Sequence, residues 1–362
     1  MHKILIMTNF PKQIREWYFQ HGRRLPWRDT KDPYKIWISE IILQQTRVDQ
    51  GLQYFHRFIK AFPSVQSLAR ASETRLMQLW QGLGYYSRAR NLHHAAQTIV
   101  NEHNATIPQT YEKINTLKGI GPYTAAAIAS FAYNLPHAVV DGNVYRVLSR
   151  YFASDIPIDS SAGKKYFFSL ANELLDKKDP ATHNQAIMDL GALICKPTKP
   201  LCHQCPVSQH CAAFATGTQQ DFPVKSKRTT RKKRHLNFLI IISDEHIVIE
   251  KRIGNDIWNG LFQFPVIESS EPFTVARISD HLKIKNKISS LKITKLLEKK
   301  HLLTHQELHS VFFKIDFPSE EDFRKWVNTT PFETIALNRI NEIPFPQLIQ
   351  QNLKKLLPPG ES

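Results

Sequence analysis

Apolar residues recur every three or four positions between Phe10 and Gly217, which is the period of an α-helix buried on one side. Proline and glycine interrupt this pattern and divide it into separate segments. The short apolar stretch within the first ten residues is far too brief to cross a membrane and is expected to be an irregular extension. The helices that the pattern predicts most clearly are Ile36–Phe58, Ser72–Trp80, Arg88–Asn101, Thr124–Tyr133 and Gly142–Tyr151.

The period changes to that of β-structure after about residue 235. We expect a turn at Asp244–Glu245 between two strands, and a helix near Phe273–Leu282. The predicted strands, including one that follows a turn, are Phe238–Ile242, Ile247–Glu250, Trp258–Pro265 and Ser310–Asp316. The chain is therefore predicted to have a mainly α N-terminal region and an α+β C-terminal domain.

A dense basic run separates the two regions. It consists of Lys225, Lys227, Arg228, Arg231, Lys232, Lys233 and Arg234. Like charges at this density repel one another, so the run is predicted to be a solvated linker that could also lie along DNA. The expected boundaries are an extension over 1–10, a helical domain over 11–217, a linker over 218–235 and an α+β domain over 236–355.

The charge of the chain indicates a polyanionic partner. The 362 residues include 48 Lys and Arg against 32 Asp and Glu, a net charge of +16. Such an excess favours phosphate backbones. No segment reaches membrane-spanning length without charges, so we expect a soluble, intracellular protein that works in the cytoplasm, on the nucleoid in a bacterium.

All four cysteines lie in one short window, with spacing C-x6-C-x2-C-x5-C: Cys195, Cys202, Cys205 and Cys211. A compact loop of this kind can direct four thiolates at one metal centre. Disulfides are disfavoured because no secretory signal is present. Structural zinc is a closer alternative, although its four-cysteine sites use two short knuckles. The spacing favours an iron–sulfur cluster, [4Fe–4S].

A glycine turn joins two helical stretches at residues 117–124. Gly119 and Gly121 leave the backbone amides unshielded, and Pro122 is suited to the first position of the next helix. Free amides at a helix N-terminus can bind a phosphate oxygen. The same pattern also fits a plain connector between two helices.

The order of three segments resembles the helix-hairpin-helix DNA glycosylase superfamily, endonuclease III branch. These segments are the turn at 117–124, the run Val139–Arg146 and the cysteine loop. Further motifs resemble the MutY-type adenine DNA glycosylases, which carry a Nudix-like C-terminal domain, and the likeness covers nearly the whole chain. They are Leu25–Arg28, Ser39–Thr46 and Gly82–Arg88.

Two carboxylates are the predicted catalytic pair. Glu40 lies among Ile and Leu residues, where the pKa of a carboxyl group should rise, although a surface glutamate is the ordinary alternative. The resemblance implies that Glu40 protonates the departing adenine. Asp141 precedes a helical stretch and is suited to cap it. The resemblance implies that Asp141 stabilises the sugar cation and that Asn143 orients its charge.

Position 123 distinguishes two reactions within the superfamily. Relatives with lyase activity carry a lysine nucleophile there, whereas this chain has Tyr123, which cannot form a Schiff base. Lys118 belongs to the phosphate side of the turn. The resemblance therefore implies a monofunctional enzyme that uses water. A bifunctional glycosylase/lyase for oxidised pyrimidines, or a non-catalytic DNA-binding module, are the alternatives.

The resemblance also implies residues that receive the extruded base. The family's wedge and strand-spreading positions are matched by Gln45, Leu83 and Tyr85, of which the last two are also ordinary core types. The walls of the adenine pocket are matched by Trp27, Arg28 and Gln185. The expected partner is duplex DNA with adenine opposite 8-oxoguanine or guanine, bound by a monomer.

The C-terminal domain is predicted to read the opposite base. Its Nudix-like pattern lacks the Arg-Glu-x-x-Glu-Glu array for Mg²⁺, offering only Glu268, Glu271, Arg277 and Asp280, so pyrophosphatase activity is not expected. The loop His301–Leu308 resembles the family segment that contacts 8-oxoguanine. Leu303 replaces a phenyl ring there, so hydrogen bonds from Thr304 and His305 are expected in place of stacking.

Overall fold

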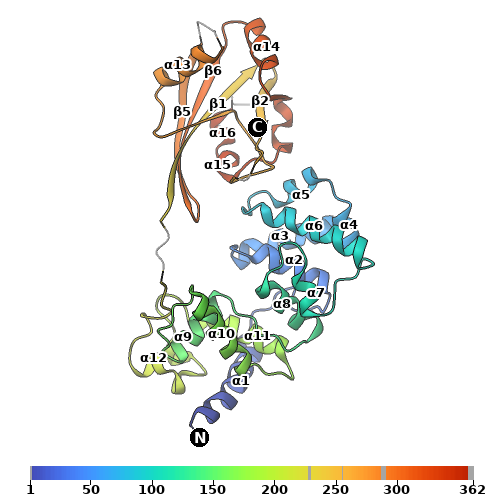
Figure 1. Cartoon of the computed structure of the whole chain (residues 1–362), viewed down its shortest axis with the longest axis vertical. Helices are drawn as coiled ribbons and strands as arrows, with labels where there is room; N and C mark the ends of the chain where they lie inside the picture. The colour runs from blue at the N-terminus through green and yellow to red at the C-terminus, as the bar shows by residue number, and fades with distance from the viewer. Residues whose placement is uncertain (1, 227–229, 255, 287–290, 358–362) are drawn as a thin grey trace. The chain divides into compact units, whose positions relative to one another are not determined.

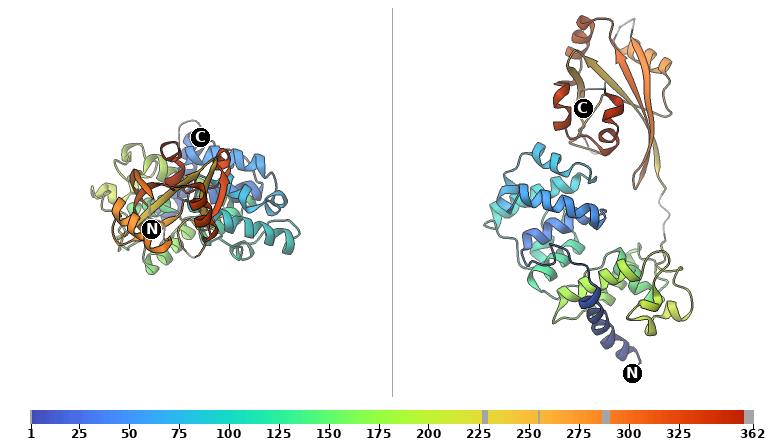
Figure 2. Two further views of the ribbon diagram at one scale, coloured as in Figure 1. Left: turned by 90° about the horizontal axis from the view of Figure 1, so that it is seen from above. Right: turned by 180° about the vertical axis from the view of Figure 1, so that it is seen from behind.

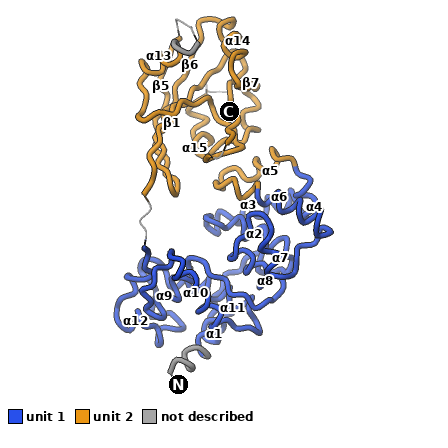
Figure 3. The backbone as a smooth tube through the Cα atoms, viewed as in Figure 1, with its two compact units in different colours: residues 1–71, 91–228 blue, residues 72–90, 229–362 orange. Residues whose placement is uncertain are grey.

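The computed structural model describes residues 2–226, 230–254, 256–286 and 291–357. Two compact units divide the chain (Figure 3). Unit 1 contains Met1–Ala71 and Asn91–Arg228, and unit 2 contains Ser72–Arg90 and Thr229–Ser362. The segment Ser72–Arg90, which the sequence pattern assigned to the helical domain, thus belongs to the unit that holds the C-terminal sheet.

Unit 1 is built from helices (Figure 1). Its longer helices are α1 (His2–His21), α2 (Pro33–Leu43), α3 (Val48–Ala61), α6 (Ser87–Glu102, which begins in unit 2), α8 (Pro122–Tyr133), α9 (Gly142–Tyr151), α10 (Ser161–Leu174) and α11 (Pro180–Asp189). Shorter helices are α4 (Val65–Ala69), α7 (Tyr111–Asn115), η1 (Leu190–Ile194), η2 (Cys202–Gln204), η3 (Ser208–His210) and α12 (Ala212–Ala215).

Two predictions for this region were wrong. The expected irregular extension over residues 1–10 is helical from His2 onward, because α1 continues toward Phe10 and Ile14, which are fully buried in the core of unit 1. The expected helix Ile36–Phe58 is two helices, since Gln45 has a φ of 60° and the chain turns between α2 and α3. The helices predicted at Thr124–Tyr133 and Gly142–Tyr151 are confirmed.

Helices α2 and α8 are apolar on nearly all sides, and they pack against each other. Each begins at a proline in a favourable position. Asp32 caps α2 by accepting a hydrogen bond from the amide of Tyr34 at 2.9 Å. In α8, Pro122 occupies the first turn, as predicted. This pair carries Glu40 and Tyr123 into the interior of unit 1.

Unit 2 contains α5 (Glu73–Trp80) and a sheet that the described residues form in the order β3-β2-β1-β6-β5. β1 and β6 are parallel, and the other pairs along this order are antiparallel. The view from behind in Figure 2 shows the long strands β1, β5 and β6 side by side. The strands are β1 (Lys232–Ser243), β2 (His246–Lys251), β3 (Phe262–Gln263), β4 (Val266–Ser269), β5 (Lys292–Leu302), β6 (Gln306–Asp316) and β7 (Glu333–Ala336). The strands predicted at Phe238–Ile242, Ile247–Glu250 and Ser310–Asp316 and the turn at Asp244–Glu245 are confirmed, whereas only Phe262–Gln263 of the unit Trp258–Pro265 is strand.

Alternate residues of the central strands enter two separate cores. Phe238 and Phe312 pack on one face, with α15 (Gln347–Gln350) and α16 (Leu353–Leu356). Leu239 and Phe313 pack on the other face, with α13 (Val275–Asn286) and α14 (Glu320–Asn328). Because both faces of these strands are covered, their sequences are continuous short apolar runs, and this is the pattern from which the strands were predicted. The helix expected at Phe273–Leu282 corresponds to α13.

The basic linker was predicted too long. Lys232, Lys233 and Arg234 are the first residues of β1, and Arg234 is only 8% exposed. The charge repulsion that was expected to keep Arg234 in solvent is overcome because Asp256 and Glu268 neutralise its guanidinium group. Lys227 and Arg228 lie outside the described residues. None of the helices in the described ranges has the length and apolar character needed to cross a bilayer.

Candidate active site

A cavity of about 440 Å³ in unit 1 brings together residues from α2, α8, α9 and α11. Eight of the predicted site residues line it: Trp27, Arg28, Glu40, Gln45, Tyr123, Asp141, Asn143 and Gln185. Leu83, Tyr85, Thr304 and His305 belong instead to unit 2. The residues Lys118, Gly119 and Gly121, and the four cysteines, lie elsewhere in unit 1.

Glu40 is a buried carboxyl group on α2, only 5% exposed. Its Oε2 accepts a hydrogen bond from the Tyr123 hydroxyl at 2.9 Å. Burial raises the pKa of Glu40 to about 7, and the nearby charge of Asp141 adds to the rise, whereas the Tyr123 hydrogen bond and Arg28 oppose it. The predicted rise is confirmed. Glu40 can therefore hold a proton near neutral pH and release it.

Asp141 caps α9, as the sequence predicted. Its Oδ1 accepts from the backbone amides of Asn143 and Val144, both at 2.8 Å, and its Oδ2 accepts from the Asn143 side chain at 2.7 Å. Burial raises the pKa of Asp141, and these hydrogen bonds and Arg146 act in the opposite direction. Three donors face Asp141 and one faces Glu40. When the two share a single proton, it therefore belongs on Glu40.

The sequence reasoning missed Asp189, which is completely buried at the end of α11. It accepts from Arg28 Nη1 at 2.7 Å and Arg28 Nη2 at 2.9 Å, and Arg23 binds the same carboxylate. Burial raises the pKa of Asp189, but the two arginines outweigh it and hold the pKa below its ordinary value. A single acidic residue within the apolar run from Ala186 to Ile194 was the signal that could have revealed it.

Gln185 faces the cavity with its amide partly engaged. Its Oε1 accepts a hydrogen bond from the Tyr18 hydroxyl at 2.6 Å. This bond fixes the side chain and orients its NH₂ group as the remaining donor. Arg28, in contrast, is held by Asp189, so it forms a wall of the cavity with its guanidinium group already paired.

Arg146 on α9 was also missed. Its Nη2 donates to Asn143 Oδ1 at 2.8 Å, and its Nε donates to the backbone carbonyl of Cys195 at 2.7 Å. This contact fixes the Asn143 amide with its NH₂ toward Asp141. Arg150, one helical turn later, donates to Cys195 Sγ at 3.4 Å. Two arginines four residues apart on a largely buried helix were the available signal.

The four cysteines are free thiols, and all of them line one small cavity of about 30 Å³. Burial raises the pKa of Cys205 to about 12, with the neighbouring thiols adding to the rise, and burial also raises the pKa values of Cys202 and Cys211. Four thiolates so close need cationic compensation, as iron provides. Within the described ranges, no three His, Cys, Asp or Glu side chains are arranged to hold a single metal ion.

The predicted phosphate-binding turn lies between α7 and α8. Gly119 has a φ of 79°, and a Cβ atom there would lie 2.5 Å from Asn91 Cβ, so a larger residue is excluded. Gly121 precedes Pro122 with no side-chain cap on α8. Lys118, Gly119 and Gly121 are exposed. The turn thus offers uncapped amides and a cation to solvent.

In unit 2, the predicted reading residues meet at the end of the β5–β6 hairpin. The expected loop His301–Leu308 is mostly strand, and Thr304 and His305 form a two-residue turn closed by a hydrogen bond from the Leu303 amide to the Gln306 carbonyl at 2.8 Å. The Thr304 hydroxyl contacts the Tyr85 hydroxyl. Leu303 packs against the core of unit 2.

Leu83 and Tyr85 differ in accessibility. Leu83 is 7% exposed, whereas Tyr85 is 47% exposed at a φ of 46°. Arg88 holds the intervening turn by donating to the carbonyls of Leu83 and Gly84, each at 3.2 Å. Insertion of Leu83 into a duplex would therefore require this turn to open.

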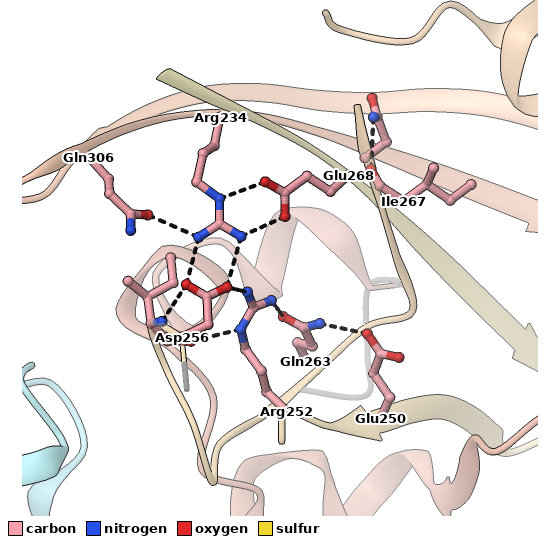
Figure 4. Close-up of polar contacts among 10 residues, drawn as sticks. Arg234, Glu250, Arg252, Asp256, Gln263, Ile267, Glu268 and Gln306 are labelled. Carbon is pink, nitrogen blue, oxygen red and sulfur yellow. Dashed lines mark hydrogen bonds and ion pairs between the residues drawn. The ribbon is translucent and has the colours of Figure 1, made fainter. Parts of the chain in front are cut away.

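Two of the acidic residues considered for a Nudix metal site, Glu268 and Glu271, are paired with arginines. Figure 4 shows Glu268 bound to Arg234, with Asp256 shared between Arg234 and Arg252. Glu271 contacts Arg277. Both carboxylates are therefore engaged with arginines, and the absence of pyrophosphatase activity stays a prediction.

Comparison with known proteins identifies both halves of the chain. Residues 38–165 match the HhH-GPD superfamily base excision DNA repair protein model, and residues 237–355 match the NUDIX domain model. An adenine DNA glycosylase of Buchnera aphidicola subsp. Baizongia pistaciae is 36% identical over 339 residues, covering 91% of this chain and 93% of that protein.

Solved structures match the helical region. A thermostable thymine-DNA glycosylase is 27% identical with a TM-score of 0.56, covering 60% of this chain and all of that chain. An endonuclease III captured as a covalent intermediate with DNA is 19% identical with a TM-score of 0.50, covering 57% of this chain and 94% of its own. The latter likeness shows a common fold.

Proposed function

Because the chain belongs to the adenine DNA glycosylase family, we propose that it is a monofunctional enzyme of base excision repair that hydrolyses the N-glycosidic bond of adenine opposite 8-oxoguanine or guanine. The observation that carries this proposal is one cavity lined by Glu40, Tyr123 and Asp141, in which Glu40 has a pKa of about 7. The substrate is duplex DNA, which the net charge of +16 favours.

Glu40 acts as the general acid. Adenine leaves the sugar more readily when one of its ring nitrogens accepts a proton, and a carboxyl group with a pKa near 7 can provide it at physiological pH. Tyr123 holds Glu40 in place through its hydroxyl group. The ionised form that remains after proton transfer is stabilised by the same hydrogen bond.

Asp141 stabilises the positive charge that develops on the sugar. Its three hydrogen bonds favour the ionised carboxylate. Asn143 fixes the direction in which the charge points, and Arg146 fixes Asn143. Negative charge near a sugar cation lowers the barrier to departure of the base.

Water is the nucleophile. Among the described residues that line the cavity no lysine is found, so no amine can attack the sugar carbon and form a Schiff base there. This supports release of the base without strand cleavage. It disfavours a lyase of the endonuclease III kind.

The extruded adenine is received by Trp27, Arg28 and Gln185, whose side chains line the same cavity. The NH₂ group of Gln185 can donate to an acceptor on the base edge. Gln45, Leu83 and Tyr85 spread the strands, and Lys118, Gly119 and Gly121 bind a backbone phosphate. Thr304 and His305 hydrogen-bond the base opposite adenine.

Cys195, Cys202, Cys205 and Cys211 would hold a [4Fe–4S] cluster. Bound there, the cluster would stabilise the fold of the cysteine loop without taking part in hydrolysis. Arg150 donates toward Cys195 Sγ and so helps to neutralise the thiolates. Iron and sulfide analysis of the purified protein tests this: four of each per chain support the cluster, and zinc would contradict it.

A base-release assay tests the proposed activity. Duplexes with adenine opposite 8-oxoguanine, guanine or thymine are incubated with excess enzyme and analysed with and without alkali. We expect cleavage only after alkali, fastest opposite 8-oxoguanine and absent opposite thymine. Strand nicking without alkali, or borohydride trapping on a thymine-glycol duplex, would favour the bifunctional alternative. Binding with no base release would favour a non-catalytic module.

A further inference from the structure

Residues 72–90 are attached by their side chains to the C-terminal part of unit 2. Gln78 Nε2 donates to the Glu342 carbonyl at 2.8 Å, and the Tyr86 hydroxyl donates to the Phe345 carbonyl at 3.5 Å. Both donors flank the turn that carries Leu83 and Tyr85. That turn therefore belongs with the sheet in space, although it precedes β1 by more than a hundred residues.

Arg90 makes a further attachment. Its Nη1 donates to the Asn259 carbonyl. The next residue, Gly260, has a φ of 81°, and a Cβ atom there would lie 3.1 Å from Arg90 Nη1 and 3.4 Å from Glu73 Oε1. Because Gly260 has no side chain, the Arg90 guanidinium group has room to lie against the loop that contains Asn259.

The loop that receives Arg90 is tied to the hairpin through Arg234. Nη1 of Arg234 donates to Asp256 Oδ1 at 2.7 Å and to Gln306 Oε1 at 3.0 Å, and its Nε donates to Glu268 Oε1 at 2.7 Å (Figure 4). Asp256 lies three residues before Asn259, and Gln306 directly follows the turn of Thr304 and His305. One buried guanidinium group therefore joins the loop that contains Asn259 to the turn end of the β5–β6 hairpin.

These contacts position the hydroxyl groups of Tyr85 and Thr304. Tyr85 and Thr304 contact each other, and each is fixed by a separate path: Tyr85 through Gln78, Tyr86 and Arg90, and Thr304 through Gln306. 8-Oxoguanine differs from guanine by an oxygen at C8 and a hydrogen at N7. Two hydroxyl groups can detect this small difference only when their separation is held to a fraction of an ångström.

We infer that Arg90 and Arg234 are specificity-determining positioning residues, which hold the Tyr85 turn and the Thr304 hairpin as one element that discriminates 8-oxoguanine from guanine. This inference rests on the proposed function. Both arginines donate to acceptors within unit 2, so they act through Tyr85 and Thr304.

A matched set at position 90 tests the inference. Arg90→Met keeps the length of the side chain and removes its donors, Arg90→Lys keeps one donor, and Arg75→Met changes an exposed arginine of α5. Single-turnover rates are measured with saturating enzyme for adenine opposite 8-oxoguanine and opposite guanine. We expect Arg90→Met to lower the ratio of the two rates roughly fivefold, because contacts remote from a ligand modulate coupling to this extent. Arg90→Lys should restore part of the ratio, and Arg75→Met should leave it unchanged.

A double-variant cycle separates positioning from general weakening. If Arg90 acts by holding Tyr85 against Thr304, then Arg90→Met has no further effect on the ratio of the two rates in a Thr304→Ala background. Fully additive effects, or an unchanged ratio in Arg90→Met, would overturn the inference while base release persists. Absence of adenine release by the unaltered protein from both duplexes would instead overturn the proposed function. Arg234→Met should lower the ratio in the same way, and should it fail to fold, the Arg90 variants alone decide.

Discussion

Two acidic sites, one in each unit, differ in what surrounds the carboxyl group. In unit 1, Glu40 is surrounded by apolar residues and accepts from a neutral tyrosine, and burial raises its pKa to about 7. In unit 2, Arg234 donates to both Asp256 and Glu268 and holds the pKa of each below its ordinary value. A carboxyl group with a pKa near neutrality can exchange a proton, whereas a carboxylate bound to a guanidinium group holds the fold together. Glu40 is therefore suited to proton transfer, whereas Asp256 and Glu268 are suited to stabilising the fold.

Unit 1 does contain a cation near Glu40, but Asp189 binds it. Arg28 lines the same cavity, and both of its Nη atoms donate to the Asp189 carboxylate. Because Asp189 neutralises Arg28, that arginine only partly offsets the rise in the pKa of Glu40. We therefore expect Asp189 to help keep the pKa of Glu40 raised, because it neutralises Arg28.

The largest expected effect comes from removing the acid of unit 1. Glu40→Gln keeps the size of the side chain but replaces the carboxylic acid with an amide, which cannot protonate the leaving adenine. Adenine release should therefore slow by roughly a thousandfold. Asp141→Asn should cause a loss of similar order, because the sugar cation then lacks its negative neighbour. Single-turnover base release measures both.

The matched control lies in unit 2. Glu298→Gln replaces an exposed glutamate of β5 and should leave the rate of base release unchanged. Full activity in both Glu40→Gln and Asp141→Asn would refute the roles assigned to them.

The burial of Glu40 and the helix cap formed by Asp141 were predictable from the sequence because local surroundings determine both. The apolar neighbours of Glu40 lie on its own helix, and the cap formed by Asp141 involves the next three residues. Strands β1, β2 and β6 were likewise predicted from local apolar runs, whereas the largely exposed β5 was not predicted.

Features that depend on distant residues were not predictable in this way. Arg234 was expected in solvent because its sequence neighbours are basic, yet its acidic partners lie 22 and 34 residues further along the chain. The attachment of residues 72–90 to the sheet depends on backbone carbonyls at Glu342 and Phe345, which carry no sequence signal. Pairings of this kind depend on tertiary packing alone.

Breaking the pairing in unit 2 should destabilise it by an intermediate amount. Arg234→Met leaves Asp256 and Glu268 without their shared cation, and because both carboxylates are partly exposed to solvent the loss should cost about 2 kcal/mol. Hydrogen exchange of peptides from β1 and β6 should show faster opening, with α2 in unit 1 unchanged. In comparison, Lys295→Met removes an exposed pair with Glu298 and should cost below about 1 kcal/mol. If the two variants destabilised unit 2 equally, Arg234 would contribute no more to stability than an exposed ion pair does.

Glu40 should itself destabilise unit 1 at neutral and higher pH. Its pKa is about 7 in the folded state, against 4.5 ordinarily, so the folded state binds the proton more tightly than the unfolded state between these values. Stability is therefore lost as pH rises from about 4.5 to 7. Glu40→Gln removes this loss, and its advantage over the unaltered protein should grow by about 2 kcal/mol between pH 5.5 and 8. Urea unfolding at both pH values measures it. A gap that shrinks with pH would contradict the raised pKa.

The smallest expected effect comes from removing the hydrogen bond between Tyr123 and Glu40. The Tyr123 hydroxyl donates to Glu40 and so stabilises the ionised carboxylate, which lowers the pKa of Glu40 relative to burial alone. Tyr123→Phe should raise that pKa further, and the fall of the base-release rate at high pH should move upward by less than about one pH unit. Single-turnover rates across the pH range measure the shift, with Tyr133→Phe, on the same helix, as a control that should leave the profile in place. A shift to lower pH would mean that Tyr123 does not stabilise the ionised form. In that case the Tyr123 hydroxyl would favour the protonated carboxyl group of Glu40.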